Sequence, residues 1–187
     1  MTLLIFVGGI VVLLLWGIII YNRLVRLRTG VRSAWHQIDV QLKRRYDLIP
    51  NLVSAVKGYM EFERDTLDRV VTARARAMAA VGLPEKAVSE NALTHEVGRL
   101  FAVVERYPVL KSSENVLQLQ EELTSTENRI AFARQFYNDL VANLATRVGS
   151  FPDNVIASIF SFHGEEYFTA GDEDRMLPAA DISAGRQ

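Results

Sequence analysis

Three histidines, His36, His95 and His163, are the side chains best suited to bind a metal ion or to transfer protons near neutral pH. His36 lies one helical turn before Asp39, but no third ligand follows at a matching spacing. The HExxH, CxxCH and Glu-x-x-His motifs of helical metal and haem sites are absent from the sequence, and so is cysteine. The residues therefore predict neither a metal ion nor another cofactor.

Covalent chemistry and phosphate binding have no better support in the sequence. The serines lie outside any GxSxG motif, and the histidines follow no recognisable catalytic-triad order. Gly8 and Gly9 lie within an uncharged apolar stretch and form no phosphate-binding loop. We therefore expect a protein that is not an enzyme, and an enzyme or ligand-binding helical bundle stays open as an alternative.

Polar residues within the predicted long helices form two clusters, one around Pro50 and one along a periodic helix later in the chain. A polar group inside a bundle fixes register and pairing when it is hydrogen-bonded. Ordinary ion pairs on the helix surface are the alternative. The predicted structural polar network comprises Arg45, Tyr46, Asp47, Pro50, Asn51, Glu127, Asn128 and Arg134.

The element that begins the chain is an uncharged run of eighteen residues from Leu3 to Ile20. As a helix this run spans about 27 Å, close to the thickness of the hydrocarbon core of a bilayer. A cleaved signal peptide is the alternative, but no basic residue precedes the run and no small-x-small site follows it. We expect a transmembrane anchor over residues 1–22, with membrane lipid as its partner.

Charge predicts the orientation of this anchor. The run is followed directly by four arginines, Arg23, Arg26, Arg28 and Arg32. The positive-inside rule therefore places the N-terminus outside and the C-terminal domain in the cytoplasm. Every acidic residue lies at Asp39 or later, so the soluble part is acidic, which argues against nucleic acid as a partner.

The strongest apolar periodicity in the soluble part runs from Ser112 to Val148 and predicts a long helix with a coiled-coil-like seam. Apolar residues recur there at steps of three and four, and Thr126 takes the one missing step. The predicted seam consists of Val116, Leu119, Leu123, Ile130, Ala133, Tyr137, Leu140, Leu144 and Val148.

A second apolar stripe begins at the membrane and continues to about Ala80. Pro50 lies inside it, removes one backbone hydrogen bond and crowds the preceding turn, so we predict a kink near Tyr46 or a break. A turn over residues 81–85 and a short helix over residues 89–106 follow. The order long, short, long favours an antiparallel bundle over residues 23–149 in which both long helices pair.

Residues 150–170 form a short amphipathic segment rich in aromatic side chains, and Pro152 favours the start of a short helix there. The segment either caps one end of the bundle, which we favour, or presents its apolar face to a partner or to the membrane surface. Residues 171–187 are predicted to be a disordered tail. The predicted interaction residues are Phe151, Ile156, Ile159, Phe160, Phe162, Tyr167 and Phe168.

Several long sequence blocks stand in order along residues 1–170. After the apolar span these are YNRLV (21–25), RRYDLIPNLV (44–53), YP (107–108), ENVLQLQEELTSTENRIAFARQFYNDLV (114–141) and FPDNVIA (151–157), with YF near the end. In these blocks the chain resembles the LemA family of bacterial membrane proteins.

The resemblance implies a topology more than an activity. LemA-like proteins have a short external N-terminus, one span and an all-helical soluble domain. This agrees with the all-α fold expected here, an N-terminal transmembrane helix continuing into an elongated antiparallel helical bundle at the inner membrane. The resemblance brings no catalytic residues.

Some LemA-like relatives belong to magnetosome membrane systems, and others are linked with membrane metalloproteases of the HtpX type. From the long amphipathic helices, the single anchor and the lack of a catalytic constellation, we expect a non-enzymatic, membrane-anchored scaffold or assembly protein of the bacterial envelope that forms a homo-oligomer or holds a membrane-protein partner. An adaptor or regulator of such a protease, in envelope quality control, is the alternative.

Overall fold

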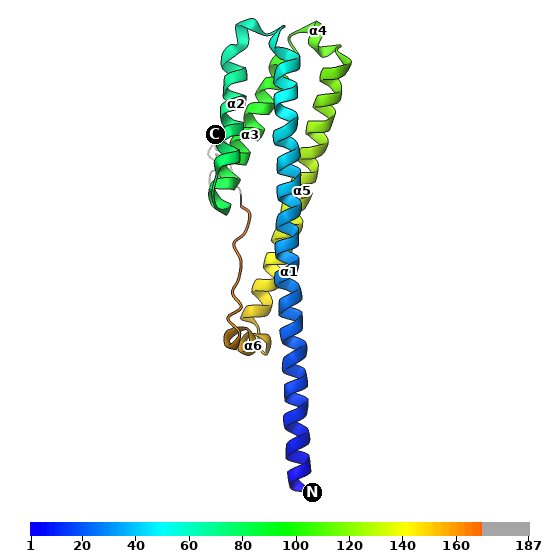
Figure 1. The fold of residues 1–187 in the computed structure, drawn as a ribbon, viewed down its shortest axis with the longest axis vertical. Coiled ribbons are helices and arrows are strands. Elements are labelled where there is room, and N and C mark those ends of the chain that lie inside the picture. Colours follow the sequence, from blue (N-terminus) through cyan, green and yellow to red (C-terminus); the bar gives the residue numbers. More distant parts are fainter. Residues whose placement is uncertain (170–187) are drawn as a thin grey trace, which may run out of the picture. The chain divides into compact units, whose positions relative to one another are not determined.

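The computed structural model describes residues 1–169, apart from the side chain of Glu61, and all regular structure in this part is helical. The predicted all-α class is therefore confirmed, and the predicted tail lies outside the described residues. The elements are α1 (Thr2–Lys57), the 3₁₀-helix η1 (Glu61–Glu63), α2 (Arg64–Ala79), α3 (Leu83–Val104), α4 (Pro108–Lys111), α5 (Glu114–Gly149) and α6 (Asp153–Ile159) (Figure 1).

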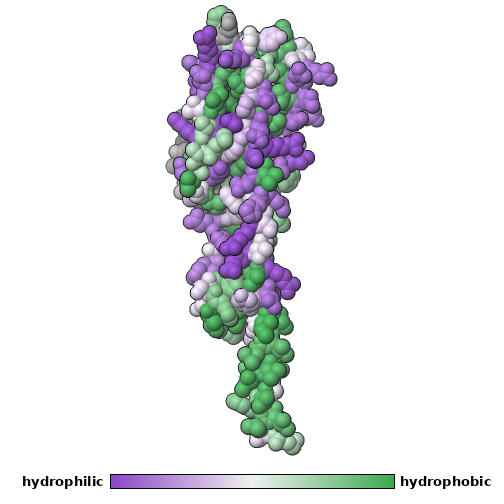
Figure 2. Space-filling model, viewed as in Figure 1, coloured by the Kyte–Doolittle hydropathy of each residue, from purple (hydrophilic) through white to green (hydrophobic). Residues whose placement is uncertain are grey.

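The apolar run Leu3–Ile20 forms the first turns of α1. By length and composition, α1 is the one helix among residues 1–169 that meets the requirements for crossing a membrane. Its residues up to Trp16 are exposed in the structure, as lipid-facing residues would be, and Figure 2 shows them as a continuous apolar surface. This part of α1 is consistent with a single-pass membrane anchor.

The helices divide between two compact units, the first comprising residues 1–45 and 124–167 and the second built mainly from residues 46–123. In the first unit α1 packs against α5, and residue numbers that rise along α1 fall along α5. The contacts that give this direction are Gly30 with Leu140, Trp35 with Tyr137, and Arg45 with Glu127. The two long helices are therefore antiparallel, as predicted.

The predicted seam of α5 is its buried face. Thr126 is almost completely buried, which agrees with its place at the missing step of the apolar pattern. Leu119, Ala133 and Leu140 are half-buried at the edges of this face. Together with Thr126, the buried residues of α5 are Val116, Leu123, Ile130, Tyr137, Val141 and Leu144.

α1 continues through Pro50, so the break that the sequence allowed there does not occur. Proline inside a helix costs about 3 kcal/mol. Pro50 itself is exposed, whereas Ile49, Leu52 and Val56 around it are completely buried. Burying one such side chain contributes about 1.5–3 kcal/mol, so the three together outweigh the cost of the proline.

The first helical stripe ends at Lys57, so the prediction of a helix continuing to about Ala80 is wrong. Glycine in a helix interior costs about 1 kcal/mol relative to alanine, and Gly58 stands where the helix stops. The Tyr59 amide then donates to the Val56 carbonyl over 3.0 Å in a turn. Buried apolar residues continue on both sides of this turn at helical spacing, which is why periodicity alone did not reveal it.

α2 and α3 form an antiparallel hairpin within the second unit. At the turn Gly82 has φ +82° and ψ 163°, a conformation essentially restricted to glycine. The Val81 amide donates to Oε2 of Glu85 over 3.1 Å, so this carboxylate ties the turn to the start of α3. α3 therefore begins at Leu83, earlier than the predicted start at Ser89.

Candidate functional site

Tyr46 of α1 lies at the centre of a buried polar cluster in the second unit. Its hydroxyl donates to the carboxylate of Glu90 on α3 and lies 3.2 Å from the backbone oxygen of Ala77 on α2. Lys86 Nζ donates to the same oxygen over 3.0 Å and lies 5.5 Å from the centre of the Tyr46 ring. Arg74 Nε donates to the backbone oxygen of Tyr46 over 2.7 Å. The cluster therefore joins α1, α2 and α3.

The cluster also satisfies the C-terminal end of α2. The carbonyl of Ala77 would accept the amide of Val81 if α2 continued, but that amide donates to Glu85 instead. Lys86 Nζ takes its place as the donor to this carbonyl. A cation at a helix C-terminus is favourable because it faces the negative end of the helix dipole. The arrangement is that of a structural cap.

The predicted polar network divides between the two units. Arg45 is buried and its Nη1 lies 3.0 Å from Oε2 of Glu127 in the first unit, whereas Tyr46 belongs to the cluster of the second unit. Arg45 on α1 and Glu127 on α5 therefore form an ion pair between the two long helices. Of the remaining predicted members, Arg134 is half-buried, and those exposed at the surface are Asp47, Pro50, Asn51 and Asn128.

Sequence reasoning did not single out Glu90, which is completely buried. Glu90 lies one turn before Leu93 and on the same stripe as Ala87 and Val97, all of which are buried. A charged residue at a position that the helical period assigns to the core was therefore the available signal. Lys86 and Arg74 left no comparable signal, because their partners are backbone oxygens on other helices.

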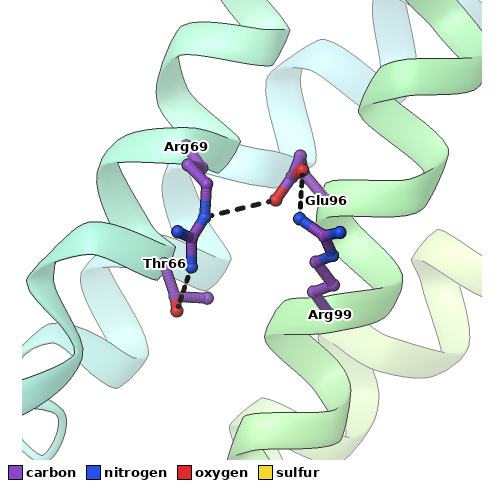
Figure 3. A network of polar contacts seen from close by, with 4 residues as sticks. All are labelled: Thr66, Arg69, Glu96 and Arg99. Carbon is purple, nitrogen blue, oxygen red and sulfur yellow. Dashed lines mark hydrogen bonds and ion pairs between the residues drawn. The ribbon is translucent and has the colours of Figure 1, made fainter.

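A second network links α2 and α3 (Figure 3). Glu96 pairs with Arg99 at 3.0 Å and with Arg69 at 3.6 Å, and Arg69 donates to the Thr66 hydroxyl over 3.1 Å. Both arginines are about half-exposed, so each pair contributes only a few tenths of a kcal/mol. A groove of about 590 Å³ lies beside Glu96, but acidic and basic residues both line it, so no single charge is left for a ligand.

Within residues 1–169 no group of three or more His, Cys, Asp or Glu side chains is placed to hold a metal ion. His36 lines a shallow groove on α1 and α5, and His95 and His163 are exposed. The absence of a cofactor and of an enzymatic activity stays a prediction.

An aromatic cluster lies in the first unit, just after the apolar run of α1. The ring centre of Tyr21 lies 4.7 Å from that of Phe160 and 5.7 Å from that of Phe162. The guanidinium of Arg28 lies 4.7 Å from the centre of the Phe162 ring, at a distance typical of a cation–π contact. The segment after α6 therefore folds back onto α1.

The same segment is held to α5. The Tyr137 hydroxyl donates to the backbone oxygen of Glu166 over 2.9 Å. Burial raises the pKa of Tyr137 above its ordinary value, and the carboxylates of Glu165 and Glu166 raise it further. The neutral phenol, which is the form that donates this hydrogen bond, is thereby favoured.

The predicted interaction residues differ in exposure. Phe162 and Phe168 are buried and Ile156 is half-buried, so these three serve packing rather than contact with a partner. The members exposed at the surface are Phe151, Ile159, Phe160 and Tyr167.

A second apolar surface, which the sequence analysis did not single out, lies on α1 and α5. Val40, Phe132 and Phe136 are exposed and line a shallow groove of about 510 Å³. Arg129 and His36 stand at the same groove. Exposed phenylalanine pairs on a helix surface are typical of faces that contact another molecule.

The profile of the LemA family matches residues 34–181, well over half of the chain. The chain belongs to the LemA family. It is similar to magnetosome protein MamQ 2 of Paramagnetospirillum magneticum, with 25% identity over 84% of this chain and 69% of that protein. It is similar to protein LemA of Metamycoplasma hominis, with 24% identity over 83% of this chain and 71% of that protein. Magnetosome protein MamQ of Magnetospirillum gryphiswaldense is 24% identical over 84% of this chain and 69% of its own length.

The resemblance seen in the sequence blocks is therefore confirmed. The LemA match begins at Ala34, after the apolar run, and includes the Tyr46 cluster, the seam of α5 and α6. The match to the LemA family thus covers most of the helical part that follows the apolar run.

Proposed function

We propose that this LemA-family protein is a non-enzymatic scaffold, anchored in the inner membrane by α1, that associates with further copies of itself. Its N-terminus faces outward and its bundle lies in the cytoplasm, because the arginines that follow the span favour the cytoplasmic side.

The observation that carries this proposal is the continuity of α1 from the apolar run into the bundle. A continuous helix has no flexible linker at the membrane, so the direction of the span sets the direction of the part of α1 that follows. Val40 lies twenty residues after Ile20, which places it about 30 Å along the helix beyond the end of the span. Every anchored copy therefore presents Val40 at about the same height.

The occupant proposed for the groove of Val40, Phe132 and Phe136 is the same groove of a second copy. A twofold axis normal to the membrane can relate two copies anchored in one bilayer with the same orientation, and such an axis brings identical patches together. Anchoring also confines the copies to two dimensions, which raises their local concentration. Aromatic side chains at the centre of such a contact supply much of its energy.

Crosslinking in native membranes tests this association. The chain has no cysteine, so Val40→Cys introduces a single thiol without further changes. We expect a short bis-maleimide to give a covalent dimer, and the further change of Phe132→Ser and Phe136→Ser to reduce its yield. Both phenylalanines are exposed, so the helices themselves should persist by circular dichroism.

The matched control is Val88→Cys, a similarly exposed valine on α3. A dimer yield for Val40→Cys no higher than for Val88→Cys would contradict the association. Labelling of Val88→Cys by an impermeant maleimide in intact cells would contradict the cytoplasmic orientation.

A further inference from the structure

α6 lies beside the last turn of the apolar run of α1. Cδ1 of Ile156 is 3.6 Å from the position of a Cβ on Gly17, and Ile20 is buried although it ends the apolar run. Gly17 precedes Ile20 by three residues, so this contact lies about 5 Å inside the end of the run. α6 is therefore at the depth where hydrocarbon gives way to headgroups.

The rotation of α6 about its own axis is fixed by two buried residues. The carboxylate of Asp153 is buried and lies 3.5 Å from Nη1 of Arg147 at the end of α5, and Ala157 is buried one turn later. Helical geometry places residues 155 and 159 on the opposite side. Both are apolar and exposed, Val155 at 49% and Ile159 at 66%, and Phe151, which precedes the helix, is 81% exposed.

The surroundings of this face match the chemistry of a membrane interface. Tyr21 contacts Phe160 directly after the span, and aromatic side chains concentrate at this level of a bilayer. Arg23 and Arg26 are exposed on the same turns of α1, where anionic headgroups attract them. Figure 2 shows apolar residues gathered over α6, next to the point where the apolar surface of the span ends.

We propose that α6 is an interfacial helix that inserts Val155 and Ile159 into the leaflet on the bundle side of the membrane that α1 spans. The occupant of this face is lipid, because the contact between Ile156 and Gly17 places the face at the edge of the hydrocarbon. α6 then gives the protein a second point of attachment, which fixes its rotation about α1. This inference does not require that the protein self-associates.

Spin labelling of the full-length protein in vesicles of phosphatidylcholine and phosphatidylglycerol tests the proposal. Single nitroxide labels are placed by Val155→Cys and Ile159→Cys, and Leu13→Cys in the span marks the hydrocarbon. The matched control for an exposed apolar site in water is Val88→Cys. Collision rates with oxygen, which prefers lipid, are compared with those of a soluble nickel chelate, which prefers water.

The oxygen-to-nickel ratio at Val155 and Ile159 should be several-fold higher than at Val88 and should approach that at Leu13. A ratio equal to that at Val88 would overturn the proposal, since the face would then lie in water. Loss of both collision rates together with spin–spin broadening would also overturn it, because a second protein copy would then cover the face. A label placed by Ser158→Cys should also have a raised oxygen-to-nickel ratio. Adding Val155→Glu and Ile159→Glu should lower that ratio to the value of the Val88 control, and an unchanged ratio would contradict insertion.

Discussion

The contribution of the Tyr46 cluster is tested most directly by Tyr46→Phe, which removes the hydroxyl and keeps the ring. The hydroxyl has one hydrogen, which it donates to the buried carboxylate of Glu90. A hydrogen bond to a charged group contributes about 1.5–3 kcal/mol, and the buried apolar area hardly changes. The Ala77 carbonyl keeps its bond from Lys86, so no buried acceptor is abandoned there. We therefore expect a loss of about 1.5–3 kcal/mol in the free energy of unfolding.

Urea unfolding of the full-length protein in detergent micelles, followed by far-UV circular dichroism, measures this change. The control is Tyr59→Phe, because Tyr59 is 57% exposed and its hydroxyl is not part of the cluster. The control should change the free energy of unfolding by less than about 0.5 kcal/mol. A Tyr46→Phe protein as stable as the control would refute the reasoning.

Glu90→Gln makes the test more specific, because the amide still accepts a hydrogen bond but carries no charge. In that background Tyr46→Phe should cost only about 0.5–1.5 kcal/mol, the range of a neutral hydrogen bond. If the cost is the same in both backgrounds, the bond between the hydroxyl and the carboxylate is not its source.

Two further changes test the turn and the aromatic segment. Gly82→Ala should lower the free energy of unfolding by about 1–3 kcal/mol because φ is +82° there. Gly98→Ala within α3 should raise it by about 0.4–1 kcal/mol. Urea unfolding that shows a change of the same sign for both variants would contradict this reasoning. Because the pKa of Tyr137 is raised in the folded protein, its stabilisation is complete below the unfolded pKa of about 10 and is lost as the pH rises through the folded value. Stability measured across this alkaline range should fall more steeply in the native protein than in Tyr137→Phe, and parallel curves would count against a raised pKa.

Much of the fold could be predicted because its signals are local. The uncharged run from Leu3 to Ile20 and the three-and-four spacing along α5 act through neighbouring residues, and both agree with the structure. The antiparallel pairing of α1 with α5 followed from the order of the helices. The break that the sequence allowed at Pro50 does not occur, because the cost of the proline is local whereas the burial that offsets it comes from packing with other elements.

The candidate site was harder to predict. Arg45 and Glu127 were singled out as polar residues on long helices, and the structure pairs them. Tyr46 was placed in the same network, but its partners Glu90 and Lys86 come from a helix whose register the sequence left open. No local pattern distinguishes such a partner from an ordinary surface charge.

The sequence by itself determined the apolar span, the helical class and the buried face of α5, because each depends on the period of the helix and the properties of consecutive side chains. Only the tertiary structure decided where α1 ends and which polar residues surround Tyr46. It also decided the contact between Ile156 and Gly17 of the membrane anchor. Those contacts join residues far apart in the chain. Their formation depends on the register between helices. The apolar stripes alone do not determine this register, because they could pack against one another in several alternative ways.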